Sequence, residues 1–180
     1  MGKVLKGLII FEIVFLVIFG GFAALGFYRR YEKEKPQAAI DKINSRKITL
    51  DDVMGKNLPP KPDQQLNDST IAGIDANNNA IRDDVELEIF ARYPNSAKIR
   101  AAMLQYAQAL QLELTEVFNS ETLISTIKKE GLAYRCLSRV NDEELDSNQK
   151  EIESLVINTE LRKKSKENAS KYMTTDSLLN

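Results

Sequence analysis

The chain has 180 residues and a nearly balanced charge, with 25 Lys and Arg against 26 Asp and Glu. It contains no histidine and one cysteine, which excludes a histidine-based catalytic triad, a histidine-ligated or cysteine-rich zinc site and an intramolecular disulfide. A net charge of -1 argues against a nucleic-acid-binding domain, because such domains normally carry a pronounced basic face.

Residues 8–28 form the most apolar segment of the chain. The run from Leu8 to Phe27 contains a single charged residue, Glu12, and twenty residues at about 1.5 Å each are enough to cross a hydrocarbon core of about 30 Å. A cleaved secretory signal is disfavoured, because the run exceeds the usual apolar region and no small-residue cleavage pattern follows it. We therefore expect a transmembrane helix or signal anchor over residues 8–28, in contact with the lipid bilayer and preceded by a short basic tail, residues 1–7.

Glu12 admits two interpretations. In the first it lies near the membrane edge, where the helix dipole favours a carboxylate and the side chain stays hydrated. In the second, the run from Lys6 through Gly7 and Leu8 to Glu12 resembles the processing site of type IV prepilins, in which a basic leader ends in glycine and a glutamate is the fifth mature residue. This resemblance implies cleavage after Gly7 and pairing of Glu12 with the terminal amine of a neighbouring subunit.

Residues 29–70 are expected to form a juxtamembrane stalk with short helices, followed by a proline-rich linker. The stalk is charged and only weakly amphipathic, so it predicts little buried surface. The prolines of the linker remove backbone donors and force extended geometry, which excludes an ordinary helix there. The apolar residues of the stalk are Ile40, Ile43, Leu50 and Val53, and the prolines are Pro59, Pro60 and Pro62.

Residues 75–86 place oxygen-bearing side chains at positions 1, 3, 5, 9 and 12 of a twelve-residue window. This is the ligand spacing of an EF-hand calcium loop. Calcium takes six to eight oxygen ligands, and alternate residues of a tight loop can turn their side chains inward while a backbone carbonyl supplies position 7. The expected ligands of one Ca²⁺ are Asp75, Asn77, Asn79, the carbonyl of Ile81, Asp83 and Glu86.

This loop resembles the EF-hand family and, more closely, the shortened calcium loops of dockerin-type and other bacterial modules that lack a full entering helix. The resemblance covers residues 74–92 and implies an exiting helix from Asp84 to about Tyr93. Ala80 stands at position 6, where the family has glycine, and positive φ there costs a residue with a Cβ roughly 1 kcal/mol. The alternative is a polar turn whose Asp83 and Asp84 favour a helix N-terminus.

The rest of the chain predicts helices. Apolar residues recur every three or four positions over residues 95–118, after a cap at Asn95 and Ser96. Another helix is expected over residues 123–137, weakened at Gly131, and a last one over residues 141–161, opened by a capping box at 141–144. No stretch shows the alternation of a half-buried strand. We expect an all-α fold, with residues 71–180 forming a calcium-loop domain of about three main helices beside the exiting helix.

The expected function is a single-pass membrane-anchored, non-enzymatic calcium-binding protein that presents a helical head to an unidentified protein partner. No nucleophile and base pair is evident, and Cys136 is expected to be a buried packing thiol, because no histidine is available to activate it. One alternative is a pilin-like component of a filament or secretion apparatus. Another is a cytoplasmic-facing adaptor with no metal.

The topology receives opposing signals. More basic residues follow the apolar segment than precede it, which favours a cytoplasmic head. A calcium loop with alanine at position 6 is expected to bind in the weaker range of extracellular modules and so to fill outside the cytosol. We expect an extracytoplasmic head, in the periplasm or at the cell surface.

Overall fold

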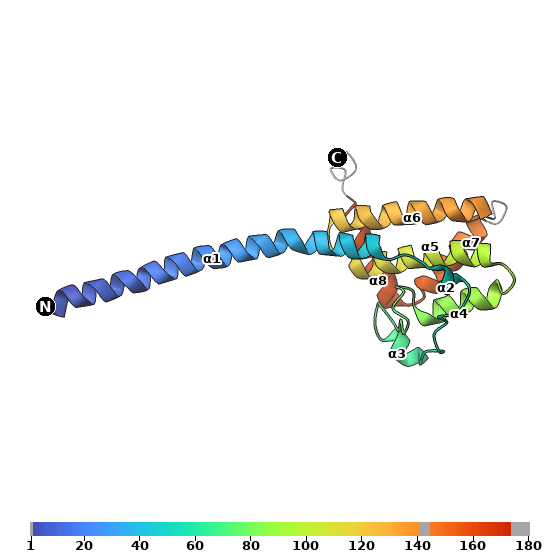
Figure 1. Cartoon of the computed structure of the whole chain (residues 1–180), viewed down its shortest axis with the longest axis horizontal. Helices are drawn as coiled ribbons and strands as arrows, with labels where there is room; N and C mark the ends of the chain where they lie inside the picture. Colours follow the sequence, from blue (N-terminus) through green and yellow to red (C-terminus); the bar gives the residue numbers. More distant parts are fainter. Residues whose placement is uncertain (1, 141–144, 174–180) are drawn as a thin grey trace. The chain divides into compact units, whose positions relative to one another are not determined.

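The computed structural model describes residues 2–140 and 145–173, and the described chain is all helical, with no strand in these ranges (Figure 1). The expected all-α fold is confirmed. The chain divides into two compact units, residues 1–38 and residues 39–180. We call the second unit the head.

Helix α1 (Gly2–Ser45) makes up the first unit and continues into the head, with Pro36 inside it. Side chains of residues 1–12, 14, 32 and 33 lie outside the description. Part of the expected span over residues 8–28 therefore lies outside it too, including Glu12. Within the part of the chain whose side chains are described, no helix is sufficiently long and apolar to cross a membrane.

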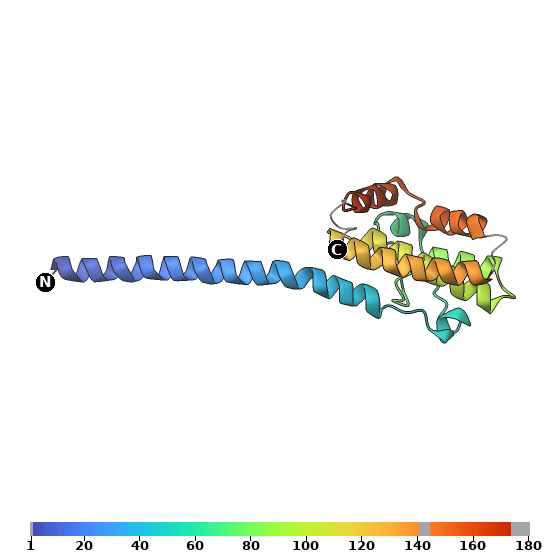
Figure 2. The same ribbon diagram turned by 90° about the horizontal axis from the view of Figure 1, so that it is seen from above.

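Helix α5 (Ala97–Glu116) is the centre of the head. Ser96 caps its N-terminus as expected, accepting a hydrogen bond from the Ile99 N–H. Every residue from Ala102 to Leu114 except Gln105 is buried, because other helices cover α5 on all sides. In Figure 1, α4 and α6 flank α5 on opposite sides, and Figure 2 shows α7 and α8 covering a third side.

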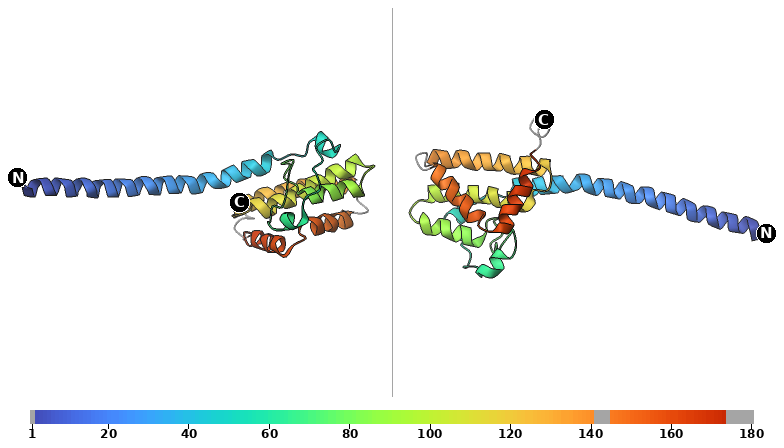
Figure 3. Two further views of the ribbon diagram at one scale, coloured as in Figure 1. Left: turned by 90° about the horizontal axis from the view of Figure 1, so that it is seen from below. Right: turned by 180° about the vertical axis from the view of Figure 1, so that it is seen from behind.

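The remaining helices pack around α5, and the two further views of Figure 3 show α2 on the side of the head opposite α7 and α8. Helix α6 makes the most extensive contact with α5 and runs unbroken through Gly131. The helices are α2 (Leu50–Val53), α3 (Gln64–Asp68), α4 (Asp83–Arg92), α6 (Ser120–Val140), α7 (Leu145–Val156) and α8 (Glu160–Ser170).

The C-terminal part of the head differs from the single helix expected over residues 141–161. It forms two helices, because Thr159 has extended backbone and its side chain accepts a hydrogen bond from the Arg162 N–H, which starts α8. The expected capping box at residues 141–144 lies outside the described residues. The exiting helix expected from Asp84 to Tyr93 is present as α4, within one residue at each end.

The head begins at residue 39, earlier than the boundary at residue 71 that the sequence indicated. Two of the apolar residues assigned to the stalk are buried in the head, Ile43 at 0 % exposed and Val53 at 8 %. Ser125 of α6 also donates to the Asn44 side chain at 3.3 Å. Residues 39–70 therefore belong to the head, because widely spaced apolar residues can still pack when the partner helix lies alongside.

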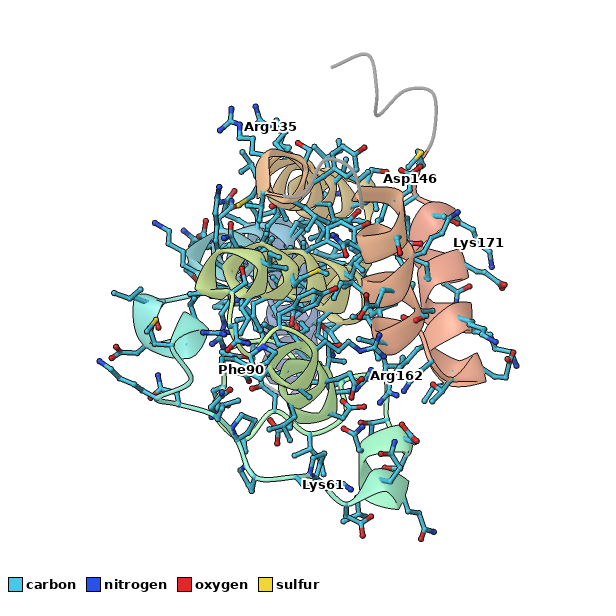
Figure 4. The ribbon with its side chains drawn as sticks, turned by 90° about the vertical axis from the view of Figure 1, so that its right-hand side faces the viewer. Lys61, Phe90, Arg135, Asp146, Arg162 and Lys171 are labelled. Carbon is cyan, nitrogen blue, oxygen red and sulfur yellow. The ribbon has the colours of Figure 1, made fainter. Side chains whose placement is uncertain are left out.

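Arg162 of α8, labelled in Figure 4, fixes the segment between α3 and the candidate loop. Its side chain is 0 % exposed, and its guanidinium donates to the carbonyls of Asn67, Thr70 and Ile71 at 2.6, 3.2 and 3.2 Å. It also donates to Asp68 at 2.9 Å. Because buried charge is tolerated only when its hydrogen bonds are satisfied, these contacts hold α3 against α8.

Substitution of Gly73 tests how tightly the segment between α3 and the candidate loop is packed, and substitution of Gly131 in α6 is the control. Gly73 has φ +66°, and a Cβ there would lie 2.2 Å from Cδ of Arg82. Gly131→Ala is the matched control, since a Cβ there would meet nothing within 4 Å. We expect Gly73→Ala to lower the free energy of unfolding in urea by at least about 2 kcal/mol, and Gly131→Ala to raise it by about 0.5–1 kcal/mol. Equal effects of the two changes would contradict the close packing of Arg82 against Gly73.

Candidate metal centre

The loop over residues 75–86 is curled by its own side chains. The Asp75 carboxylate accepts hydrogen bonds from the backbone N–H groups of Asn79 at 3.1 Å and Ala80 at 2.9 Å. The side-chain oxygen of Asn79 accepts one from the Ile81 N–H at 2.8 Å. Asp and Asn side chains favour such turns because they bond to backbone a few residues ahead. The residues expected as ligands therefore also shape the loop.

Two residues of the loop adopt left-handed backbone. Asn78 has φ +57° and Ala80 has φ +64°. Asparagine visits this region readily, whereas alanine in it costs roughly 1–2 kcal/mol because its Cβ crowds the following carbonyl. Position 6 thus has the backbone that favours glycine, and the rest of the structure offsets its strain.

The carboxylates of Asp83 and Glu86 are both 0 % exposed and point into the loop. One Glu86 oxygen, Oε2, accepts hydrogen bonds from the side-chain amides of Asn77 and Asn79, both at 3.0 Å. Asp83 Oδ1 accepts one from the Ala76 N–H at 2.9 Å. Positions 3, 5 and 12 are therefore in direct contact, and position 9 closes the loop from the start of α4.

Each of these buried carboxylates has one oxygen without a hydrogen-bond partner in the described structure, Oδ2 of Asp83 and Oε1 of Glu86. Burial raises the pKa of Glu86 to about 7, and the neighbouring charges of Asp52 and Asp83 act in the same direction. Burial also raises the pKa of Asp83, with Asp75 adding to the effect. A buried carboxylate oxygen without a partner is costly, and a cation is the kind of ligand that would satisfy several at once.

Ile81, at position 7, packs its side chain into the core at 1 % exposed. This burial fixes the backbone beside Asp83, because a packed side chain has little rotational freedom. The role of the Ile81 carbonyl as a ligand stays a prediction.

Residues outside the loop hold its backbone, and the sequence did not identify them. Gln108 of α5 is buried and donates to the Asn79 carbonyl at 2.7 Å. Arg46 donates to the Asn78 carbonyl at 2.5 Å, and the Asn77 amide donates to the Asn57 carbonyl at 2.9 Å. Gln108 is one of several polar residues in α5, so neither its position nor that of Arg46 marked a contact with the loop.

Arg82, at position 8, joins the loop to the C-terminus of α7. Its guanidinium is 0 % exposed and donates to the carbonyls of Leu155 at 2.8 Å and Val156 at 3.0 Å. It also bonds to both carboxylate oxygens of Asp84, at 2.7 and 3.0 Å. A positive charge at a helix C-terminus is favourable because the last carbonyls are unpaired.

In residues 2–140 and 145–173, no group of three or more histidine, cysteine, aspartate or glutamate side chains is placed to hold a metal ion. The three carboxylates of the candidate loop, Asp75, Asp83 and Glu86, are therefore not placed together as metal ligands in the described structure, and calcium binding by the loop stays a prediction. The other expected ligands are two asparagine side chains and one backbone carbonyl, a combination that EF-hand loops also use.

Comparisons with models of protein families, with curated proteins and with solved structures found no match to this chain.

A second group of acidic side chains lies between α5, α6, α7 and α8. Glu113 of α5 is buried and forms an ion pair with Lys166 of α8. Glu153 of α7 accepts hydrogen bonds from the Tyr106 hydroxyl at 3.1 Å and from the Gln149 amide at 3.0 Å. Burial, a hydrogen bond with Glu113 and the charge of Glu113 raise the pKa of Glu130 to about 8.

This arrangement predicts a pH dependence of stability. Glu130 titrates at its ordinary value of 4.5 when unfolded and at about 8 when folded. The unfolded chain loses its proton first, so stability is highest at low pH and falls as pH rises from about 4.5 to about 8. We expect Glu130→Gln to reduce this fall, measured as the free energy of unfolding in urea across that range with chelator present.

Glu121→Gln is the matched control, because Glu121 is an exposed acid on the same helix and its removal should leave the pH profile unchanged. Glu86 contributes in the same range in all three proteins, so the difference between variant and wild type isolates Glu130. Parallel profiles for Glu130→Gln and wild type would show that Glu130 has no raised pKa in the folded protein.

Proposed function

We propose that this protein is a single-pass membrane-anchored, non-enzymatic protein whose helical head binds one calcium ion at residues 75–86 and presents a helical surface to another protein. The observation that carries the calcium proposal is the pair of fully buried carboxylates, Asp83 and Glu86, each with an oxygen that has no partner in the described structure.

The chemistry of the loop favours calcium. Its expected ligands are all oxygens, and Asp75, Asp83 and Glu86 supply three negative charges opposite a divalent cation. Asn77 and Asn79 each carry an amide oxygen beside the nitrogen that bonds Glu86, and rotation of the amide can present either atom. Calcium accepts six to eight such ligands in a flexible shell, whereas magnesium demands near-ideal octahedral geometry.

A structural role for the ion follows from what the loop connects. Asn57 follows α2, Gln108 belongs to α5, and Arg82 reaches the end of α7, and each forms a hydrogen bond that links its element to the loop. An ion that fixes the loop would therefore stabilise several elements of the head together. A catalytic role lacks support, because the chain has no histidine and the loop holds no nucleophile beside a base.

The membrane anchor is supported by the apolar residues of α1 in the first unit. The large apolar side chains there that are described are at least half exposed, with Phe22 at 72 % and Phe27 at 79 %. Apolar surface on all sides of one helix is typical of a segment in contact with lipid. The residues concerned are Ile13, Phe15, Leu16, Val17, Ile18, Phe19, Phe22, Leu25 and Phe27.

The pilin-like component is the second candidate, favoured by the spacing of Gly7 and Glu12 in the sequence. The same exposed apolar helix would then pack against other copies in a filament. The intact mass of the mature protein separates the two candidates, because processing leaves Leu8 as the first residue. A chain that begins at Met1 or Gly2 would exclude processing after Gly7.

Calcium binding can be measured on the full chain in detergent micelles by titration calorimetry and thermal unfolding. We expect one bound ion and a stabilisation of RT ln(1 + [L]/Kd), about 2.7 kcal/mol at a hundredfold excess over Kd. Glu86→Gln should abolish most of the binding heat and the stabilisation, because it removes the carboxylate at position 12.

Glu88→Gln is the control for this experiment. Glu88 lies on the same helix but pairs with Arg92, outside the loop, so its removal should leave calcium binding intact. Absence of both heat and stabilisation at millimolar calcium in the wild type would reduce the loop to a polar turn and would favour the adaptor without metal.

Topology can be tested by labelling cells with a membrane-impermeant thiol reagent. Gln65 is exposed on α3, and we expect Gln65→Cys in a Cys136→Ala background to be labelled once the outer barrier is permeabilised, because the head is extracytoplasmic. Lys3→Cys in the same background lies on the other side of the predicted span and should be labelled only after the inner membrane is lysed. The reverse pattern would place the head in the cytosol.

A further inference from the structure

Two adjoining hollows lie along α5 and α6 of the head. One, of about 290 Å³, is lined by residues 46–48 with Gln105, Gln108 and Lys129. The other, of about 450 Å³, is lined by Lys98, Ala101 and the last two turns of α6. Leu132 lines both, so the two hollows lie side by side, and we call the surface that they form together the basic groove.

Every charged residue that lines the basic groove is basic. The whole chain has nearly equal numbers of basic and acidic residues, so a surface without bias would carry both signs. Lys98, Arg135 and Arg139 form no ion pair with an acidic side chain in the described part of the head. The charged lining residues are Arg46, Lys47, Lys98, Lys129, Arg135 and Arg139.

The centre of the groove is apolar. Leu132 is 59 % exposed, although a large apolar side chain gains free energy when it is removed from water. Ala133 and Cys136 lie beside it on α6 and leave room above the helix.

The groove follows one face of α6. Lys129, Leu132, Cys136 and Arg139 are spaced by three, four and three residues, which places them in one row. From the first to the last the row is about 15 Å long, and Figure 4 shows Arg135 beside it projecting away from the bundle.

We infer that the basic groove binds a helical protein segment that carries acidic side chains on both flanks of an apolar stripe. Apolar residues of the segment cover Leu132 and fill the two hollows, and its carboxylates meet the cations at the two ends of the groove. The inference rests on the proposed role in protein interaction, for which it names the surface and the partner chemistry, and it does not require a bound calcium ion.

The shape of the groove favours a protein segment over an anionic membrane. A bilayer surface is broad and smooth, and it is recognised by residues that protrude from a protein, such as those of an amphipathic helix. Here two recesses lie beside the exposed Leu132 and the cations, and side chains of a protein segment can fill them, whereas a smooth bilayer surface cannot. A helix of about three turns matches the length of the row on α6.

The test is selection of a displayed library of random helical peptides on the full chain in detergent micelles. We expect the enriched peptides to carry Asp or Glu beside an apolar stripe. The double variant Arg135→Glu/Arg139→Glu should weaken their binding at least about tenfold, and Leu132→Ser should weaken it as well. Affinity should fall as the salt concentration rises, because exposed charges are screened.

Lys164→Glu/Lys171→Glu is the matched control, because it changes the net charge by the same amount at exposed positions on and just after α8. It should keep full affinity. Failure to enrich any peptide, enrichment without an acidic bias, or equal affinity for both double variants would overturn the inference. Binding to vesicles of phosphatidylcholine and phosphatidylserine that depends on Arg135 and Arg139, without peptide enrichment, would assign the surface to lipid instead. Calcium calorimetry on the same variants keeps this result separate from the fate of the calcium proposal.

Discussion

The hydrogen bonds of the buried Arg82 guanidinium are the contacts that hold the candidate loop against the rest of the helical head. Arg82 lies between Ile81 and Asp83, two of the expected ligands, and its own side chain is fixed on the last carbonyls of α7. The backbone of the loop therefore cannot move without breaking bonds at the end of another helix. Movement of the loop would be costly, because a buried guanidinium that lost these partners would keep its desolvation cost without the hydrogen bonds that offset it.

Arg162 performs a corresponding task for the chain that enters the loop. An EF-hand uses a helix before the loop to fix its first ligand, and here the segment after the prolines of residues 57–63 contains only the five-residue helix α3. Instead α8 binds the carbonyls after α3 through Arg162, and the Asn67 side chain accepts from the Ile74 N–H at 2.9 Å. A helix distant in sequence thus takes the place of a full entering helix.

The sequence predicted the features that depend on neighbouring residues. Ser96 at the start of α5, the extent of α4 and the inward curl at Asp75 all follow from side chains within a few positions. It did not predict the burial of Ile43 or the roles of Arg162 and Gln108, because these contacts join residues far apart in the chain. The break at Thr159 is local, but the apolar spacing of a longer helix concealed it.

Arg46 and Gln108 belong to both the loop and the basic groove, so the two proposed ligands would act on the same side chains. Arg46 and Gln108 both line the groove and both donate to carbonyls of the loop, at Asn78 and Asn79. A ligand that orders either side chain reduces the conformational entropy that the protein loses when the other ligand binds. By linkage this effect is reciprocal. The strained backbone of Ala80 and the buried carboxylates of Asp83 and Glu86 both cost free energy, and the contacts that offset these costs exist only while the loop stays closed.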